Sequence, residues 1–381
     1  MTHRPPLSIL DLVPISSGSN AAQALRNSID LSLHAERLGY RRYWFAEHHL
    51  NPGVAGVSPA VVIALVASAT STIRVGSGGV QLGHRTALSV VEEFGLLDTA
   101  YPGRLDLGLG RSQSRPSRRA PGSSPPRSLA AARAAADGVT ANGLLIPKKF
   151  PIETLLRSPS VGLQRSMTLL PNAQPPDYGE QIDDILALLR GSYQSAEGLE
   201  AHAVPGEGAD VEVWILGSSG GQSAEVAGRN SLRFAANYHI SPATILEAVE
   251  SYRAAFRPSA ELERPYIAVS ADVVVADDEE KARELAAGYG LWVRSIRVGS
   301  GAIPFPTFEE AGSHSWADQD RELVADRVTT QFVGTPGQVA DRLCCLAEAT
   351  GADELVVTTI THDHADRVRS YELLAREWMS V

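Results

Sequence analysis

Eight short apolar runs alternate with helix-like segments along this chain, and this alternation constrains the fold more than any other feature. The runs span residues 7–14, 42–46, 73–80, 104–109, 211–216, 233–237, 266–275 and 354–360. Strands that are separated by helices pair in parallel, and eight such units predict closure into a barrel. An open, doubly wound sheet is the main alternative, since a sequence shows the number of strands better than their closure.

The helix-like segments carry suitable start and stop signals. They span residues 21–38, 59–71, 87–100, 178–189, 223–229, 242–256, 278–293, 336–350 and 365–378. Gly39 and Gly351 follow two of them as C-terminal glycines, and Thr335-Pro336 supplies an N-cap followed by proline in the first turn. The local signals therefore agree with the strand and helix pattern.

The chain has 381 residues, which exceeds the roughly 250 of a bare eight-stranded barrel. Two irregular stretches account for the excess: residues 112–176, which contain ten prolines, and residues 299–315. We predict one domain over residues 1–381, a (β/α)8 TIM barrel with long insertions after strand 4 and after helix 7. Residues 112–176 form an insertion that is either an ordered lid or a disordered loop.

Composition excludes several classes of protein. The net charge is −10, and the one basic run, residues 111–119, is short, so we expect no nucleic-acid partner. Since no stretch of eighteen apolar residues occurs, we expect no membrane span and a cytoplasmic location. The two cysteines, Cys344 and Cys345, are adjacent in a predicted helix, so we expect unpaired core residues in a reducing compartment.

A carboxylate and two imidazoles leave the second predicted strand together as Glu47-His48-His49. In a barrel, catalytic groups lie where strands end, and a histidine there can act as a base, with Glu47 fixing its tautomer. The alternative is a hydrogen-bonded structural pair. His362, Asp363 and His364 follow the last strand, but neither group has a familiar metal-ligand spacing, so we expect no metal.

Three further segments suit a flat ligand that carries a phosphate. Gly78 and Gly79 end the third strand, where backbone can approach a ring closely, although a β-bulge would also explain them. Arg111 ends the fourth strand and suits a phosphate, although a surface salt bridge is equally compatible. A loop runs from the fifth strand into a helix through Ser218, Ser219, Gly220, Gly221 and Ser223. Backbone N–H groups at that helix start favour an anion.

These segments, in this order, resemble the bacterial luciferase-like flavin monooxygenases over most of the chain. The resemblance rests on residues 47–49, 75–80, 101–111, 216–219, 333–336 and 351–355. It implies that His48 is the catalytic base and that a non-prolyl cis peptide joins Gly78 to Gly79 beneath the flavin ring. It also implies that Arg111, Ser218 and the loop from Ser219 to Ser223 bind the phosphate. The chain departs from the family pattern in residues 112–176 and in an extra residue at Gly220-Gly221.

The resemblance implies a function that combines these roles. Reduced FMN (FMNH2), made by a separate flavin reductase, would act as co-substrate with O2 to oxidise a small organic molecule, in a protein expected to be a homodimer. No nicotinamide-binding fingerprint occurs, which favours a two-component system. Two alternatives remain: a deazaflavin-dependent hydride-transfer enzyme on the same fold, and a flavin-binding protein without activity, against which the retained Glu47-His48-His49 argues.

Overall fold

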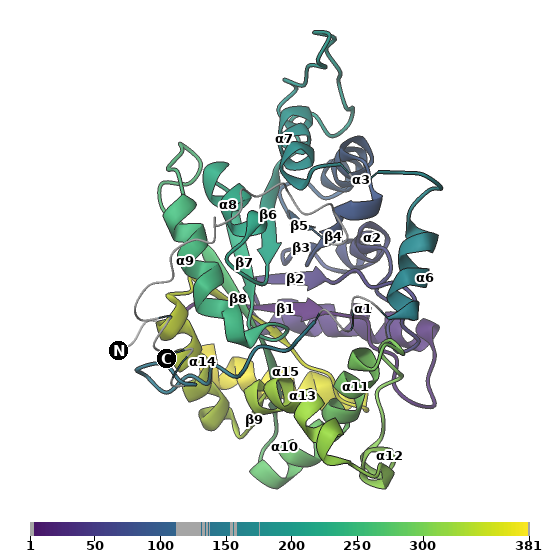
Figure 1. Ribbon diagram of the computed structural model, residues 1–381, viewed down its shortest axis with the longest axis vertical. Helices are drawn as coiled ribbons and strands as arrows, with labels where there is room; N and C mark the ends of the chain where they lie inside the picture. The colour runs from purple at the N-terminus through teal and green to yellow at the C-terminus, as the bar shows by residue number, and fades with distance from the viewer. Residues whose placement is uncertain are drawn as a thin grey trace.

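A computed structural model describes residues 4–111, 131, 134, 136, 138–152, 155, 158–174 and 176–379. Eight parallel strands form a closed barrel surrounded by helices (Figure 1). They are β1 (Leu7–Asp11), β2 (Arg42–Phe45), β3 (Arg74–Ser77), β5 (Leu105–Gly110), β6 (Val211–Gly217), β7 (Arg233–Asn237), β8 (Ile267–Val275) and β10 (Glu354–Thr358). Because β10 pairs with both β8 and β1, the barrel prediction is confirmed and the open sheet is excluded.

Two short strands lie outside the ring of eight. The run expected at 73–80 divides into β3 and β4 (Val80–Gln81), with Gly78-Gly79 between them, and β4 pairs with β5. The other, β9 (Phe332–Gly334), extends the pairing of β8 beyond the barrel. Three residues give too short a pattern to predict a strand.

Most helices begin and end close to where the sequence places them. They are α1 (Ala21–Leu38), α2 (Pro59–Ala69), α3 (Ala87–Ala100), α7 (Tyr178–Leu189), α8 (Gln222–Arg229), α14 (Pro336–Thr350) and α15 (His364–Met379). The end signals are the expected ones: the Asn20 side chain accepts from the Gln23 N–H at 3.0 Å, and Gly39 ends α1 with φ 82°.

Two expected helices are each divided. The segment 242–256 is a 3₁₀ turn, Pro242–Thr244, followed by α9 (Ile245–Ala255). The segment 278–293 is α10 (Glu279–Ala286) followed by α11 (Gly288–Arg297), so the second irregular stretch begins after α11.

Three of the helices whose bounds the structure describes were not predicted. α6 (Pro159–Thr168) lies in the proline-rich insertion, where Pro159 occupies the first turn instead of breaking a helix. The other two, α12 (Phe308–Ser313) and α13 (Asp318–Thr330), lie between α11 and β9. The expectation that 299–315 is irregular is therefore wrong for α12. Residues 112–130 of the insertion lie outside the described residues.

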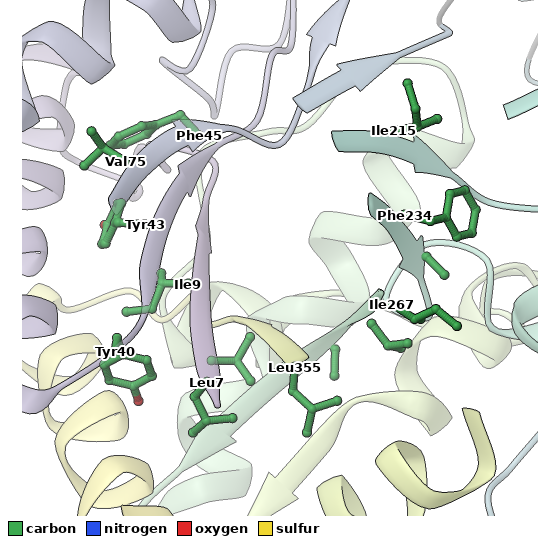
Figure 2. Packing of buried hydrophobic residues seen from close by; sticks show 14 of the residues in the cluster. Leu7, Ile9, Tyr40, Tyr43, Phe45, Val75, Ile215, Phe234, Ile267 and Leu355 are labelled. Carbon is green, nitrogen blue, oxygen red and sulfur yellow. The ribbon is translucent and has the colours of Figure 1, made fainter. Parts of the chain in front are cut away.

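The alternating faces of the strands separate two cores. The outward-facing side chains of β1 and β2 pack against the helices; they are Leu7, Ile9, Tyr43 and Phe45 (Figure 2). The corresponding faces of β6, β7 and β8 also point outward. Inside the barrel, the rings of Trp44 and Trp214 meet with centroids 5.0 Å apart. The two cysteines are unpaired, as expected; both are half-buried, and Cys344 packs against the outer core.

Charged side chains close the end of the barrel where the strands begin. The buried Arg42 guanidinium contacts Asp106 at 2.9 Å, Glu212 at 3.0 Å and Glu354 at 2.8 Å. This network leaves the carboxyl ends of the strands as the open mouth. Within the described residues, no helix is both long enough and apolar enough to cross a membrane.

Candidate functional site

The barrel brings the predicted site residues to one mouth. β2 pairs with β3, β3 with β5, and β5 with β6, so the segments that leave these four strands are neighbours. Glu47, His48 and His49 follow β2, Gly78 and Gly79 follow β3, and Arg111 follows β5. Closure of the barrel thus places side chains from distant parts of the chain together.

Glu47 is a buried anion at the centre of a hydrogen-bond network. Its Oε1 lies 2.9 Å from His49 Nε2, 3.2 Å from His84 Nε2 and 3.5 Å from the Arg85 guanidinium. Its Oε2 accepts the Gln81 backbone N–H at 2.8 Å. Burial alone would raise the pKa of this carboxyl, but the donors from His49, His84 and Gln81, with the charge of Arg85, outweigh burial and lower the pKa to about 2.

This network corrects one expectation and adds residues. Glu47 holds His49 and His84, whereas no hydrogen bond joins it to His48 within the described chain. Gln81, His84 and Arg85 were not predicted as site residues, although His84 follows the third predicted strand. The rings of His49 and His84 also meet edge to face, with centroids 5.0 Å apart.

His48 lies beside this network and lines a cavity. Its backbone N–H donates to the Gly56 carbonyl at 2.8 Å, which fixes the turn after β2. Burial lowers the pKa of the half-buried imidazole to about 4; the charge of His49 acts in the same direction and that of Glu47 opposes it. His48 is therefore neutral at pH 7, the state in which an imidazole nitrogen can accept a proton.

The Gly78-Gly79 segment leaves no room for side chains. The peptide bond between these glycines is cis, as the resemblance implied. A Cβ on Gly78 would lie 2.5 Å from Leu10 Cδ1, and one on Gly79 would lie 2.7 Å from the Gly108 carbonyl oxygen. The wall of the mouth is therefore bare backbone at this point, which suits close approach of a planar ring.

Arg111 and Ser223 lie near Tyr178, a residue that was not predicted to belong to the site. Tyr178, the buried first residue of α7, donates from its hydroxyl to the Leu109 carbonyl at 3.3 Å. Burial raises the pKa of Tyr178, while a hydrogen bond with Ser223 and the charge of Arg111 act against that rise. Both predicted phosphate-binding side chains therefore lie around this phenol.

The loop from Ser218 to Ser223 has the expected form. Ser218 Oγ accepts from Asn237 Nδ2 at 3.3 Å, and the Thr244 hydroxyl donates to the Ser218 carbonyl. Behind the loop, a Cβ on Gly220 would lie 2.3 Å from Ser251 Oγ, so this glycine is required for packing. Gly221 is the N-cap of α8 and provides no side chain to cap its first N–H groups. The Ser219 side chain faces Gly221 across this turn.

Glu47, His49 and His84 also form a group with metal-ligand character, since their ligand atoms all lie within 4.8 Å of one another. However, four protein donors already surround the carboxylate, and the Arg85 cation is one of them. These contacts satisfy the anion without a metal. The expectation of a metal-free site stays a prediction.

Three other histidines follow barrel strands: His362 and His364 after β10, and His239 after β7. His362 Nε2 contacts the Ser17 carbonyl at 3.1 Å, and His364 Nε2 contacts Asp30 at 2.9 Å, so the histidines after β10 have partners away from the other site residues. His239 follows β7, is buried and hydrogen-bonds Ser270. Burial, then Arg327 and His48, hold the pKa of His239 well below its usual value.

The fold is that of a known protein family. The family model described as luciferase-like monooxygenase matches residues 6–139 and 173–354. The chain belongs to the luciferase-like monooxygenase family, and it is an oxidoreductase. It is 36% identical over 373 residues to the uncharacterized protein YvbT of Bacillus subtilis, covering 98% of this chain and 96% of that protein. To the luciferase-like monooxygenase of Escherichia coli K12 it is 34% identical over 367 residues, or 96% of this chain and 95% of that protein.

Solved structures share the fold. The crystal structure of apo-MsnO8 has a TM-score of 0.77 and 30% identity and covers 99% of both chains. The oxygenating component of 3,6-diketocamphane monooxygenase from Pseudomonas putida, solved in complex with FMN, has the same fold with a TM-score of 0.63. It is 19% identical to this chain, and the match covers 98% of this chain and 97% of that one. An F420-dependent secondary alcohol dehydrogenase also has this fold, with a TM-score of 0.58, 14% identity and 99% of both chains covered. The fold therefore serves flavin and deazaflavin enzymes.

Proposed function

We propose that this protein is a flavin-dependent monooxygenase that uses reduced FMN and O2 to oxidise a small organic substrate. The observation that carries the proposal is the convergence, at one barrel mouth, of a neutral imidazole, a bare Gly78-Gly79 wall and the side chains of Arg111 and Ser223 around Tyr178. A phosphate and a planar ring are the two parts of FMN that such a surface would hold.

The residues present fit FMN. Arg111, the Ser223 hydroxyl and the start of α8 would hold the phosphate, and the backbone at Gly78-Gly79 would lie under the ring. Bound reduced FMN supplies two electrons for the reduction of O2, with one oxygen atom passing to the substrate and the other leaving as water. Neutral His48 would take up a proton from the reduced cofactor at Nε2 or Nδ1 and return it to the oxygen atom that leaves as water, so that no net proton is released.

A separate flavin reductase would supply the reduced FMN, since the sequence contains no nicotinamide fingerprint. The F420-dependent enzyme of the same fold supports one competing function, hydride transfer from a deazaflavin without oxygen. An anaerobic titration of the protein with reduced FMN and, separately, with reduced F420 distinguishes the two. We expect saturable binding of FMN at micromolar concentrations; preferential binding of F420 would refute the proposal.

We also propose that the protein is a homodimer that associates through α2 and α3. Val61 and Leu65 on α2 are 60% and 40% exposed, and Leu88 and Leu96 on α3 are 46% and 62% exposed. Exposed apolar side chains on neighbouring helices favour association with a second copy. Analytical ultracentrifugation tests this: the wild type should sediment as a dimer and a Val61→Glu, Leu65→Glu variant as a monomer. A monomeric wild type would refute it.

A further inference from the structure

An apolar cavity of about 320 Å³ adjoins His48. Its walls come from the segment after β2, from α11 and from α6, and its apolar lining includes Leu12, Val54, Val161, Trp292 and Ile296. No Asp, Glu, Lys or Arg is among the described residues that line it. The titratable side chains on its described surface are His48 and His49, and His48 is neutral at pH 7.

Three of the six polar side chains that line the described part of the cavity, His49, Asn51 and Ser160, already have hydrogen-bond partners. Asn51 donates from Nδ2 to the His49 carbonyl at 2.9 Å, and its Oδ1 accepts the Ala302 N–H at 2.7 Å. Ser160 donates to the Gly299 carbonyl. The side-chain amide of Gln164 also lines the cavity, and no described residue hydrogen-bonds that side chain. The cavity therefore offers three uncharged hydrogen-bonding side chains, those of His48, Gln164 and Ser300, and no described counter-ion.

The roof of the cavity is a lightly anchored helix. Figure 1 shows α6 at the edge of the molecule, outside the ring of strands, and it has no buried residue. The N-terminus of α6 packs against Gly299, whose φ is +87°. A Cβ added to Gly299 would lie 3.1 Å from Ser158 Cβ. The family model leaves residues 140–172 unmatched, so this roof lies outside the part of the chain that defines the family.

Size and polarity define what such a space accepts. A volume of about 320 Å³ corresponds to about ten water-sized groups at ~30 Å³ each. An ionised carboxylate placed there would lose part of its hydration, and no described side chain of the lining supplies a counter-ion, so its binding is disfavoured, whereas alkyl groups gain by leaving water.

We propose that this cavity is the substrate site, that it selects an uncharged, mainly apolar molecule of about ten non-hydrogen atoms, and that α6 sets this selectivity. The inference rests on the proposed function in one respect: a monooxygenase needs its substrate beside the residue that handles the proton, and His48 lines this cavity.

The test compares ligands of equal length that differ in charge. Isothermal titration calorimetry of the full chain with octan-2-one and with octanoate, at pH 7 and without flavin, should show the ketone binding at least tenfold more tightly. From pentan-2-one to octan-2-one, affinity should rise roughly fourfold for each added methylene and then level off. Equal affinity for ketone and carboxylate, or no binding of either, would overturn the inference.

Charge substitutions on α6 then locate the site. Val161→Lys places a cation in the lining, so octanoate should gain at least fivefold relative to octan-2-one. Ser166→Lys makes the same charge change at an exposed position of α6 that does not line the cavity, and it should leave the ratio unchanged. If both variants behave alike, the ligands bind elsewhere. Circular dichroism confirms that both variants are folded.

A second titration separates this inference from the proposed function. With saturating FMN present, the affinity for octan-2-one should change by less than twofold, because the two ligands would occupy different places. Competition between FMN and octan-2-one would overturn the inference. If FMN fails to bind while the ketone and carboxylate still differ as expected, the cofactor proposal fails and the selectivity of the cavity stands.

Discussion

Replacing Glu47 by glutamine should destabilise the protein substantially. The native environment lowers the pKa of this carboxyl from 4.5 to about 2, which corresponds to about 3 kcal/mol of stabilisation at pH 7. Glutamine retains one acceptor oxygen. It would have to serve either the imidazoles of His49 and His84 or the Gln81 N–H, because its NH2 group is a donor.

The assay is urea unfolding of wild type and variant, with the difference in free energy measured at several pH values. The folded pKa lies below the unfolded one, so the carboxylate contributes fully above pH 4.5 and loses its contribution as the pH falls toward 2. We therefore expect a loss of about 3 kcal/mol at pH 7 that shrinks below pH 4.5.

Glu93→Gln is the matched control. Glu93 contacts the same Arg85, at 2.9 Å, but its side chain is 38% exposed, so its loss should cost less than about 1 kcal/mol. The reasoning is wrong if Glu47→Gln costs no more than Glu93→Gln, or if its cost is the same at pH 3 and at pH 7.

Three further predictions concern turnover and cofactor binding. His48→Ala should leave FMN affinity nearly unchanged and reduce turnover by ~10²–10⁴ in steady-state assays; unchanged turnover at saturating substrate would remove His48 from the reaction. Arg111→Ala should weaken FMN by about 2–3 kcal/mol in fluorescence titrations and affect riboflavin, which lacks the phosphate, much less; equal losses would place Arg111 away from the phosphate. Replacing residues 116–174 with a short Gly/Ser linker removes α6 and should preserve FMN binding while more hydrogen peroxide is released, because water reaches the flavin. A shortened protein that releases no additional peroxide would contradict a role for this segment as a lid.

Hydropathy periods predicted the barrel well because its strands and helices bury one face over many residues. The bounds of α1, α3, α7 and α14 agree with the predicted ranges. The elements missed have weak patterns: β9 has three residues, and α13 buries only Val324, Arg327 and Thr330 among its described residues. The prolines of the insertion led to the prediction of an irregular stretch where α6 lies, because a proline such as Pro159 can start a helix as readily as it can end one.

The site was predictable as a set of strand ends but not as a set of contacts. The order of strands places Arg111 and Ser218 on neighbouring segments, and the register of β5 with β6 agrees. The partners of Glu47 depend on how the 3₁₀ turn at Leu82–His84 folds back, and the position of Tyr178 depends on the N-terminus of α7. Such contacts arise from tertiary packing, which no local pattern in one sequence encodes.

The central claim is that this barrel mouth uses reduced FMN to transfer oxygen to a substrate. The most direct test mixes the protein, chemically reduced FMN and an uncharged ketone or thioether with ¹⁸O2, and analyses the product by mass spectrometry. We expect one ¹⁸O atom in the product, with the yield lost in His48→Ala. An unlabelled substrate with all electrons recovered as hydrogen peroxide would contradict it, as would substrate reduction by reduced F420 in the absence of oxygen.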